Sequence, residues 1–255
     1  MAGRSLMPGD IRFYLHGKSS SLWRYAVSET VQALVGWMPG LPGIALRAVA
    51  YKAILHAQGL PAIEDRVRIV RSEDVWLGAR VYLDYGVYLH GGPGGIHIGA
   101  GSWIMNGSRL HVFNFRDMPQ SGIRLGCRTF VGEGTIMRGQ GGIRVGDNVL
   151  FGPAVQILAV NHVFTDPDRP IMDQGITAEG IVIEDNCWIG AGALVLDGVT
   201  IGRGSTIGAG SVVASSVPAH SLAVGSPARV IRDLRTHPLT RSNVEVFRGG
   251  MERFH

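Results

Sequence analysis

The sequence predicts a mainly β protein, in which a parallel β-helix of about six triangular coils follows an N-terminal helical segment and precedes a short C-terminal tail. Two observations predict this fold class: a glycine excess confined to one part of the chain and a six-residue repeat within that part. Of the 37 glycines among 255 residues, seven precede residue 77 and 28 lie between Gly78 and Gly225. Hydrophobic residues make up 45% and charged residues 17% of the chain, so the glycine-rich part is folded rather than disordered. The predicted units are residues 1–70 (helical), 71–228 (β-helix with a loop inserted at 159–182) and 229–255 (tail).

The first unit carries apolar residues at helical spacing over residues 22–38 and 44–58, with serines before the first stretch as candidate caps. Two prolines interrupt its apolar part, which falls short of the roughly 20 residues that a membrane-spanning helix needs. We expect these helices to pack on the β-helix or on a partner subunit. Residues 20–58 could instead lie on an anionic membrane surface, because cations border their apolar face. These cations are Arg24, Arg47 and Lys52.

The repeat begins at Leu77 and can be written as fourteen hexads. Their first position is Leu, Ile or Val in thirteen hexads and Phe151 in the other; their second position is glycine in nine. The fifth position is Ser, Thr, Ala or Val in thirteen hexads and Cys187 in the last. This period fits a short strand and a tight corner, so three hexads close one coil with the first position inside and glycine easing the corner.

The insertions between coils all follow the third hexad of a coil, so every loop should leave the β-helix along one edge. The longest insertion adds 20 residues, at about 159–182, and one-sided insertions of this kind often form the binding face of a repeat protein. It carries His162, whose imidazole titrates near neutrality and can take a proton from a hydroxyl group. The coils begin at Leu77, Ile98, Leu125, Val145, Ile183 and Ile201.

Four features together resemble the hexapeptide-repeat acyltransferases, and most closely their galactoside and maltose O-acetyltransferase branch. They are the hexads, the pair Asn161-His162, the run from Ile181 to Gly192 and the segment from Gly225 to Arg229. The resemblance covers about residues 77–232. It implies a left-handed coil, a homotrimer with sites at subunit boundaries, acetyl-CoA as the acyl donor and no metal.

The resemblance also implies roles for particular residues. His162 corresponds to the general base, Trp188 to a residue near the pantetheine and the acceptor, and Arg229 to a basic residue near the nucleotide of CoA. Glycine-rich corners would let the pantetheine approach the backbone. The candidate catalytic residues are His162 and Asn161; the candidate substrate-binding residues are Asp166, Asp173, Glu179 and Trp188; the candidate cofactor-binding residues are Trp188, Gly190, Ala191, Gly208, Ala209 and Arg229.

Two positions depart from the family pattern. Gly132 stands where an acceptor-binding asparagine is expected, and Gln140 stands near the place of an acidic residue. The galactoside or maltose pocket is therefore not carried over. Asp166, Asp173 and Glu179 are instead the candidates for binding the acceptor or orienting the imidazole.

The expected function is acetyl-CoA-dependent O-acetylation of a hydroxyl on a sugar or glycoconjugate, which would be a small molecule or a glycan. Three alternatives stay open: N-acetylation of an amino sugar, a non-catalytic β-helix scaffold, and a zinc carbonic anhydrase-like protein. The last would use histidines near the loop edge, namely His90, His97 and His111.

Composition narrows the partners and the location. The net charge is +4, without a basic run or a nucleic-acid-binding motif, so no nucleic-acid partner is expected. Cys127 and Cys187 are too few for a disulfide framework or a four-ligand metal site, and we expect both to be buried thiols. No secretion signal opens the chain, so we expect a cytoplasmic protein, at the inner face of the membrane if its helices bind there.

Overall fold

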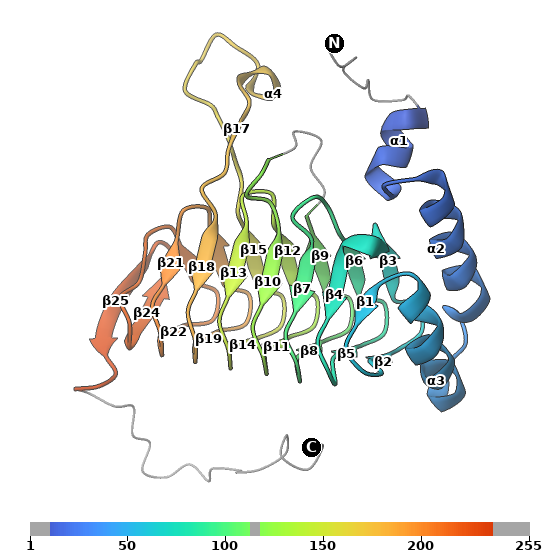
Figure 1. Cartoon of the computed structure of the whole chain (residues 1–255). Helices are drawn as coiled ribbons and strands as arrows, with labels where there is room; N and C mark the ends of the chain where they lie inside the picture. The colour runs from blue at the N-terminus through green and yellow to red at the C-terminus, as the bar shows by residue number, and fades with distance from the viewer. Residues whose placement is uncertain (1–10, 113–117, 237–255) are drawn as a thin grey trace.

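The computed structural model describes residues 11–112 and 118–236 and shows a left-handed parallel β-helix with helices packed at its N-terminal end (Figure 1). Within the described residues, seven coils follow one another, and each coil contributes one strand to each of three sheets. Sheet A contains β1 (His56–Ala57), β4 (Val75–Leu77), β7 (Ile96–Ile98), β10 (Ile123–Leu125), β13 (Ile143–Val145), β18 (Ile181–Ile183) and β21 (Thr200–Ile201).

The other two sheets are built in the same way, with parallel pairing between successive coils. Sheet B contains β2 (Ala62–Ile63), β5 (Tyr82–Leu83), β8 (Trp103–Ile104), β11 (Phe130–Val131), β14 (Leu150–Phe151), β19 (Trp188–Ile189), β22 (Thr206–Ile207), β24 (Ser221–Gly225) and β25 (Ala228–Asp233). Sheet C contains β3 (Arg68–Val70), β6 (Tyr88–His90), β9 (Arg109–His111), β12 (Ile136–Arg138), β15 (Gln156–Leu158), β20 (Leu194–Leu196) and β23 (Val212–Val213).

The β-helix begins earlier than the boundary at residue 70 that the sequence suggested. Strands β1 to β3 form a complete first coil, whose inward positions are Ala57, Ile63 and Ile69. This coil has no glycine at its second hexad positions, so the repeat is hard to recognise there. At the other end, residues 228–233, mostly assigned to the tail, form β25 and pair antiparallel with β24. Residues 237–255 of the predicted tail lie outside the described residues.

The predicted interior is confirmed by the structure. The first hexad positions of all coils from Leu77 onward are buried, with Phe151 wholly inaccessible to solvent. The fifth positions, such as Ser102 and Thr129, are buried at the corners. Burial of apolar surface at about 25 cal/mol per Å² makes this column of aliphatic side chains the main source of stability.

The glycines at the second hexad position avoid a Cβ clash as predicted, but the clash is with the next coil and not within the turn itself. None has a positive φ; instead, a Cβ at Gly152 would lie 2.6 Å from the backbone nitrogen of Ala191 in the next coil. Glycine is needed there because two coils touch through their backbones. The left-handed turn conformation falls two residues later, at the fourth hexad position, where even Ala154 (φ 58°) adopts it.

The N-terminal helices cover the exposed edge of the first coil. They are α1 (Ile11–Lys18), α2 (Leu22–Val35), α3 (Gly40–Ala50) and the 3₁₀ turn η1 (Tyr51–Ala53). The break between α2 and α3 is shorter than predicted, since Pro42 lies in the first turn of α3, where proline is tolerated. Ser21 caps α2 as expected, with its Oγ accepting from the N–H of Arg24 at 3.2 Å.

Two buried polar side chains join this helical layer to the β-helix. The amide of Gln32 pairs with the backbone of Ile69 on strand β3, donating to its carbonyl and accepting from its N–H, both at 2.9 Å. The guanidinium of Arg47, fully buried, donates to the carbonyls of Ile63, Val35 and Met38 at 2.7, 3.0 and 2.5 Å. These bonds satisfy backbone groups at the sheet edge and at the end of α2. Without them, the same groups would be left unpaired.

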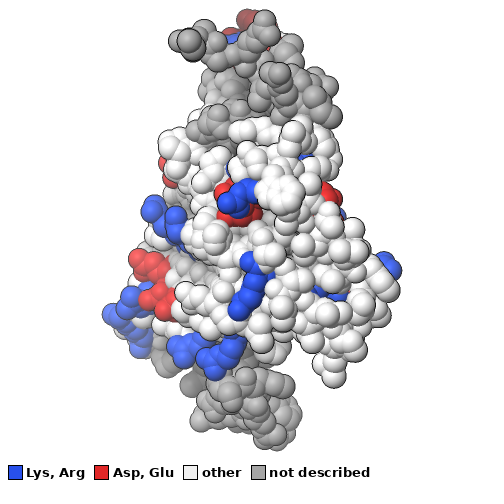
Figure 2. Space-filling view, turned by 45° about the vertical axis from the view of Figure 1, so that its right-hand side comes forward, with Lys and Arg blue, Asp and Glu red and all other residues white. Residues whose placement is uncertain are grey.

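The outer faces of α2 and α3 are apolar and exposed. Trp23 is 76% exposed, Trp37 63% and Leu41 81%. Figure 2, which brings the side of the helices forward, shows a broad surface with few charged groups. Within the described residues, no helix combines the length and apolarity needed to cross a bilayer.

Substitution at the second hexad position should destabilise the β-helix more than substitution at the fourth. Gly152→Ala would press a methyl group against the backbone of the next coil, which should cost about 1–3 kcal/mol and lower the melting temperature by several degrees. Ala154→Gly, two residues away, relieves a left-handed alanine and should change stability by less than about 1 kcal/mol. Thermal unfolding measures both, and equal losses would contradict the backbone-contact explanation.

Candidate functional site

The long insertion is an ordered hairpin that projects from the edge between sheets C and A (Figure 1). Strand β16 (Asn161–His162) pairs antiparallel with β17 (Ile176–Thr177), with Asn161 opposite Thr177 and His162 opposite Ile176. Asn161 and His162 are both exposed. Within the described residues the imidazole of His162 makes no hydrogen bond, so its nitrogens are available to a ligand.

The tip of the hairpin is held together by Gln174, at the end of α4 (Ile171–Gln174). Its amide donates to the carbonyls of Asp166 and Arg169 at 2.8 and 2.7 Å and accepts from the N–H of Asp166 at 3.0 Å. The carboxylate of Asp166 accepts from the N–H of Asp168 at 3.0 Å and so stabilises the turn. Asp173 is exposed on α4. Neither carboxylate bonds to His162 in the described part of the chain.

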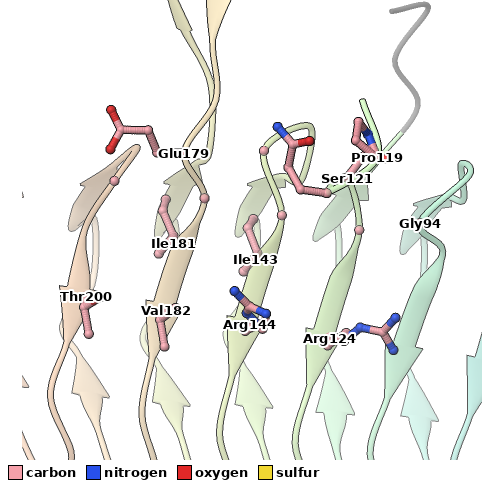
Figure 3. Close-up of a pocket in the computed structure, with 16 residues that line it drawn as sticks. Gly94, Pro119, Ser121, Arg124, Ile143, Arg144, Glu179, Ile181, Val182 and Thr200 are labelled. Atoms are coloured by element: carbon pink, nitrogen blue, oxygen red, sulfur yellow. The ribbon is translucent and has the colours of Figure 1, made fainter. Parts of the chain in front are cut away.

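A groove of about 420 Å³ lies at the foot of the hairpin, against the outer face of sheet A (Figure 3). Of the candidate residues from the sequence, only Glu179 lines it. Neither Asn161 nor His162 is part of its lining. The groove and the histidine are therefore neighbouring parts of one edge rather than a single closed pocket. The other polar side chains of the groove are Gln120, Ser121, Arg124, Arg144 and Thr200.

Sequence reasoning missed Arg124 and Arg144. Each stands directly before the first position of a hexad, in Ile123-Arg124-Leu125 and Ile143-Arg144-Val145. Because successive side chains of a strand alternate between faces, a residue before a buried first position must point outward. The hexad pattern alone would therefore have predicted that both arginines lie on the same outer face of adjacent coils.

Trp188 lies on the far side of the β-helix from the hairpin. It is in β19 on the outer face of sheet B, 52% exposed, in register between Leu150 and Thr206. Sheet B faces away from the edge between sheets C and A, from which the hairpin rises (Figure 1). One chain alone therefore does not bring His162 and Trp188 together.

The candidate CoA-binding corners have a packing role within the chain. A Cβ at Gly190 would lie 2.5 Å from the backbone nitrogen of Ala209, and one at Gly208 would lie 2.7 Å from the Cγ1 of Val224. The space left by these glycines is filled by the neighbouring coil, whereas Ala191 and Ala209 are exposed. Arg229 is exposed on β25, and its guanidinium donates to the carbonyl of Ala228 at 3.0 Å.

The histidines considered for zinc fall into two separate groups. His90 and His111 meet edge to face with ring centroids 4.7 Å apart, while His97 stacks on Trp76 at 4.3 Å. The Nε2 of His90 lies 2.8 Å from the carbonyl oxygen of Gly17. Burial lowers the pKa of His90 and of His111 to about 4. Within the described residues, no cluster of three or more potential metal ligands is found.

The two cysteines differ from each other. Cys187 is buried as predicted, its Sγ lies 3.3 Å from the carbonyl oxygen of Gly202, and burial raises the pKa of its thiol. Cys127 is exposed, contrary to the prediction. Cys127 occupies the third position of its hexad, two residues after the inward residue. This position lies on the outside of a corner.

Comparisons with known proteins agree with this fold and repeat. A family model described as "Bacterial transferase hexapeptide (six repeats)" matches residues 180–215. A "probable acetyltransferase" of Mycobacterium tuberculosis is 33% identical over 153 residues, which are 60% of this chain and 50% of that protein. A galactoside O-acetyltransferase of Lactococcus lactis is 42% identical over 93 residues, which are 36% of this chain and 44% of that protein. The chain thus spans about half the length of these curated relatives.

Among solved structures, a variant of AntD, an N-acyltransferase from Bacillus cereus in complex with dTDP and coenzyme A, superposes with a TM-score of 0.51. It is 19% identical, and the match covers 71% of this chain and 86% of AntD. At this identity the likeness concerns the fold. Repeat, fold and relatives together resemble those of the hexapeptide-repeat acyltransferases, and the family model itself matches residues 180–215.

The pair of the buried His90 and the half-buried His111 should make the protein sensitive to acid. Because the folded pKa of His90 and His111 is about 4 and the unfolded value about 6.5, the unfolded chain binds more protons between these values. Stability should therefore fall as the pH decreases from about 6.5 to about 4.

Thermal unfolding across this pH range measures the effect. His111→Phe, which keeps a ring beside Tyr88, should flatten the pH dependence, whereas Thr165→Ala in the exposed hairpin should leave it as in the wild type. A wild-type protein whose melting temperature does not change over this range would rule out the buried neutral pair.

Proposed function

We propose that the protein is an acetyl-CoA-dependent O-acetyltransferase that acts on a hydroxyl of a sugar or glycoconjugate, with His162 as general base. The observation that carries the proposal is the placement of His162 on a paired strand, exposed and unbonded within the described residues, above a polar groove. The family and the acetyltransferases among its relatives support acyl transfer.

The proposed reaction uses the imidazole twice. A neutral ring nitrogen of His162 accepts the proton of the acceptor hydroxyl as its oxygen attacks the thioester carbonyl of acetyl-CoA. The carbon–sulfur bond then breaks, the acetyl ester forms, and the imidazolium returns the proton to the departing thiolate. The net products are the acetylated acceptor and CoA. Asn161 is proposed to position the ring or the acceptor, and an N–H group of the site to stabilise the oxyanion.

A homotrimer with sites at subunit boundaries fits the separation of the candidate residues. His162 rises from the edge between sheets C and A, and Trp188 lies on sheet B, on the other side of the prism (Figure 1). A cyclic assembly would bring the hairpin of one copy to sheet B of the next. In that arrangement Trp188, the exposed Ala191 and Ala209, and Arg229 would line the donor site that His162 of a neighbour completes.

Transfer to a hydroxyl is favoured over transfer to an amine by the galactoside O-acetyltransferase among the relatives. The alternative of an amino sugar stays open, because a general base serves either nucleophile. The two products differ chemically: an acetyl ester is cleaved by mild alkali, whereas an acetamide is not.

Replacement of His162 should remove most of the activity. CoA release from acetyl-CoA is measured with a panel of neutral and phosphorylated sugars, and His162→Ala should lower kcat/KM by roughly 10²–10⁴-fold, as expected when a general base is lost. Thr165→Ala, an exposed residue of the same hairpin, is the matched control and should retain wild-type activity.

Undiminished turnover in His162→Ala would reject the mechanism. Absence of turnover with every sugar, together with no binding of CoA in a calorimetric titration, would favour the scaffold alternative. Mass and alkaline lability of the product then separate ester from amide.

We further propose that α2 and α3 bind an anionic membrane surface. Their outer faces expose Trp23, Trp37 and Leu41, and tryptophan favours the interface between water and lipid. Glu29 is the only acidic residue between residues 14 and 58, and it is paired with Arg68, whereas Arg24 and Lys52 are exposed. A surface of this composition is complementary to negatively charged headgroups.

Vesicle sedimentation tests this contact. The protein should bind vesicles that contain phosphatidylglycerol better than pure phosphatidylcholine, and the double change Trp23→Ala/Trp37→Ala should abolish binding. Tyr85→Ala, an exposed aromatic residue of the β-helix, should not affect it. If the double variant instead dissociates the oligomer while vesicles bind neither protein, the faces are subunit contacts and the membrane proposal is wrong.

A further inference from the structure

The outer face of sheet A carries two arginines directly opposite each other. Arg124 of β10 and Arg144 of β13 are register partners, and both side chains are exposed. Figure 3 shows both side chains on the outer face of adjacent strands beside the groove at the foot of the hairpin, with the Arg144 guanidinium over its own strand and that of Arg124 extending toward β7. Among the strand pairs of the described residues, no other register position joins two charges of the same sign.

Within the described residues, no carboxylate forms an ion pair with either arginine. Like charges at directly opposed positions destabilise a sheet, so the arrangement costs stability unless an anion lies between them. The ion pairs of the described residues join Arg68 to Glu29, Arg71 to Asp74 and Arg203 to Asp185. Neither Arg124 nor Arg144 takes part, and neither guanidinium makes a hydrogen bond within the described part of the chain.

The nearby carboxylates do not neutralise the pair. Asp147, which follows β13, accepts from the N–H of Cys127 at 2.7 Å, and Asp185 accepts from the N–H of Asp147 at 2.9 Å. Glu179 lies at the opposite end of the groove, beside Gly198 (Figure 3). In the preceding coil, the register partner of Arg124 is His97 of β7. Burial and the positive charge of Arg124 lower the pKa of this histidine. Within the described residues, neither arginine is therefore paired with one of these carboxylates.

The groove offers further polar groups at suitable places. Thr200 and Gln120 line it together with the arginines, and the amide of Gln120 donates to the carbonyl of Ala178 at 3.1 Å. Glycines at its rim, among them Gly142 and Gly180, keep it open. Its volume of about 420 Å³ is in the range of small-ligand sites.

We propose that this groove binds the acceptor of the reaction and that Arg124 and Arg144 hold a phosphate or diphosphate group of that acceptor. Planar guanidiniums match phosphate oxygens by paired N–H···O bonds, and two cations suit a group with about two negative charges. Glu179, at the other end of the groove, would accept hydrogen bonds from sugar hydroxyls. The groove lies below the hairpin that carries His162, so the acceptor role rests on the proposed function.

Binding of inorganic pyrophosphate tests the anion site without any catalysis. Calorimetric titration of the full chain at constant ionic strength should show binding to the wild type. Arg124→Gln and Arg144→Gln should each weaken it by roughly tenfold or more, as expected for the loss of one charged hydrogen-bonding partner, and the double variant should not bind. Arg109→Gln, an exposed arginine on sheet C, is the matched control and should bind as the wild type does.

Three results would each overturn the assignment. They are a wild type that does not bind pyrophosphate, a double variant that still binds it, and an Arg109→Gln variant that loses as much affinity as the other variants. Sedimentation velocity of the double variant provides another check, because dissociation of the assembly would show that the arginines pair with carboxylates of a neighbouring copy. An unchanged oligomeric state is expected.

Acetyl transfer to glucose, glucose 1-phosphate and UDP-glucose connects the groove to the reaction. The phosphorylated sugars should have the lower KM, and Arg144→Gln should raise that KM roughly tenfold with little change in kcat and no change for glucose. Pyrophosphate binding without transfer to any sugar would reject the proposed function and leave the anion site intact. Transfer without any advantage of the phosphorylated sugars would reject the groove as the acceptor site and leave the function intact.

Discussion

The structure depends on the stacking of one coil on the next at the spacing of a parallel β-ladder, about 4.8 Å. At that distance the backbones of two coils touch at the corners, so a side chain at Gly152 would collide with Ala191. The same spacing requires each corner to turn within few residues, which places the fourth hexad position in the left-handed region even where it is Ala154. Stacking also aligns inward residues such as Phe151 into one continuous apolar column.

The regular stacking is interrupted at one edge of the β-helix. The chain leaves the ladder along the edge between sheets C and A, and there the insertion forms a hairpin with its own hydrogen bonds. His162 is therefore held on a paired strand, which limits the orientations that its backbone can adopt. The groove at the base of the hairpin combines this edge with the outward face of sheet A, where Arg124 and Arg144 add positive charge.

The two ends of the β-helix differ: helices cover the first coil, whereas at the other end sheet B gains one antiparallel strand. At the N-terminal end, Gln32 and Arg47 reach from the helices to backbone groups of the first coil. At the C-terminal end, β25 folds back antiparallel onto β24. The covered edge at the N-terminal end prevents further strands from adding there. The helical layer that covers the first edge exposes an apolar outer face, including Trp23 and Trp37, which makes it available for a second contact.

The sequence by itself determined the coil, its interior and the edge from which the loops leave, because a six-residue period constrains every strand in the same way. It did not reveal the first coil, where Ala57 and the absence of second-position glycines hide the period, nor the reason for those glycines elsewhere. It singled out His162 and Glu179 but not the arginine pair. Only the tertiary structure decided that a groove lies beside Arg124 and Arg144 and that Trp188 lies on the far side of the β-helix from His162. Both arrangements involve residues of different coils. The distance between such residues depends on the length of each insertion between the coils and on the register in which the coils stack.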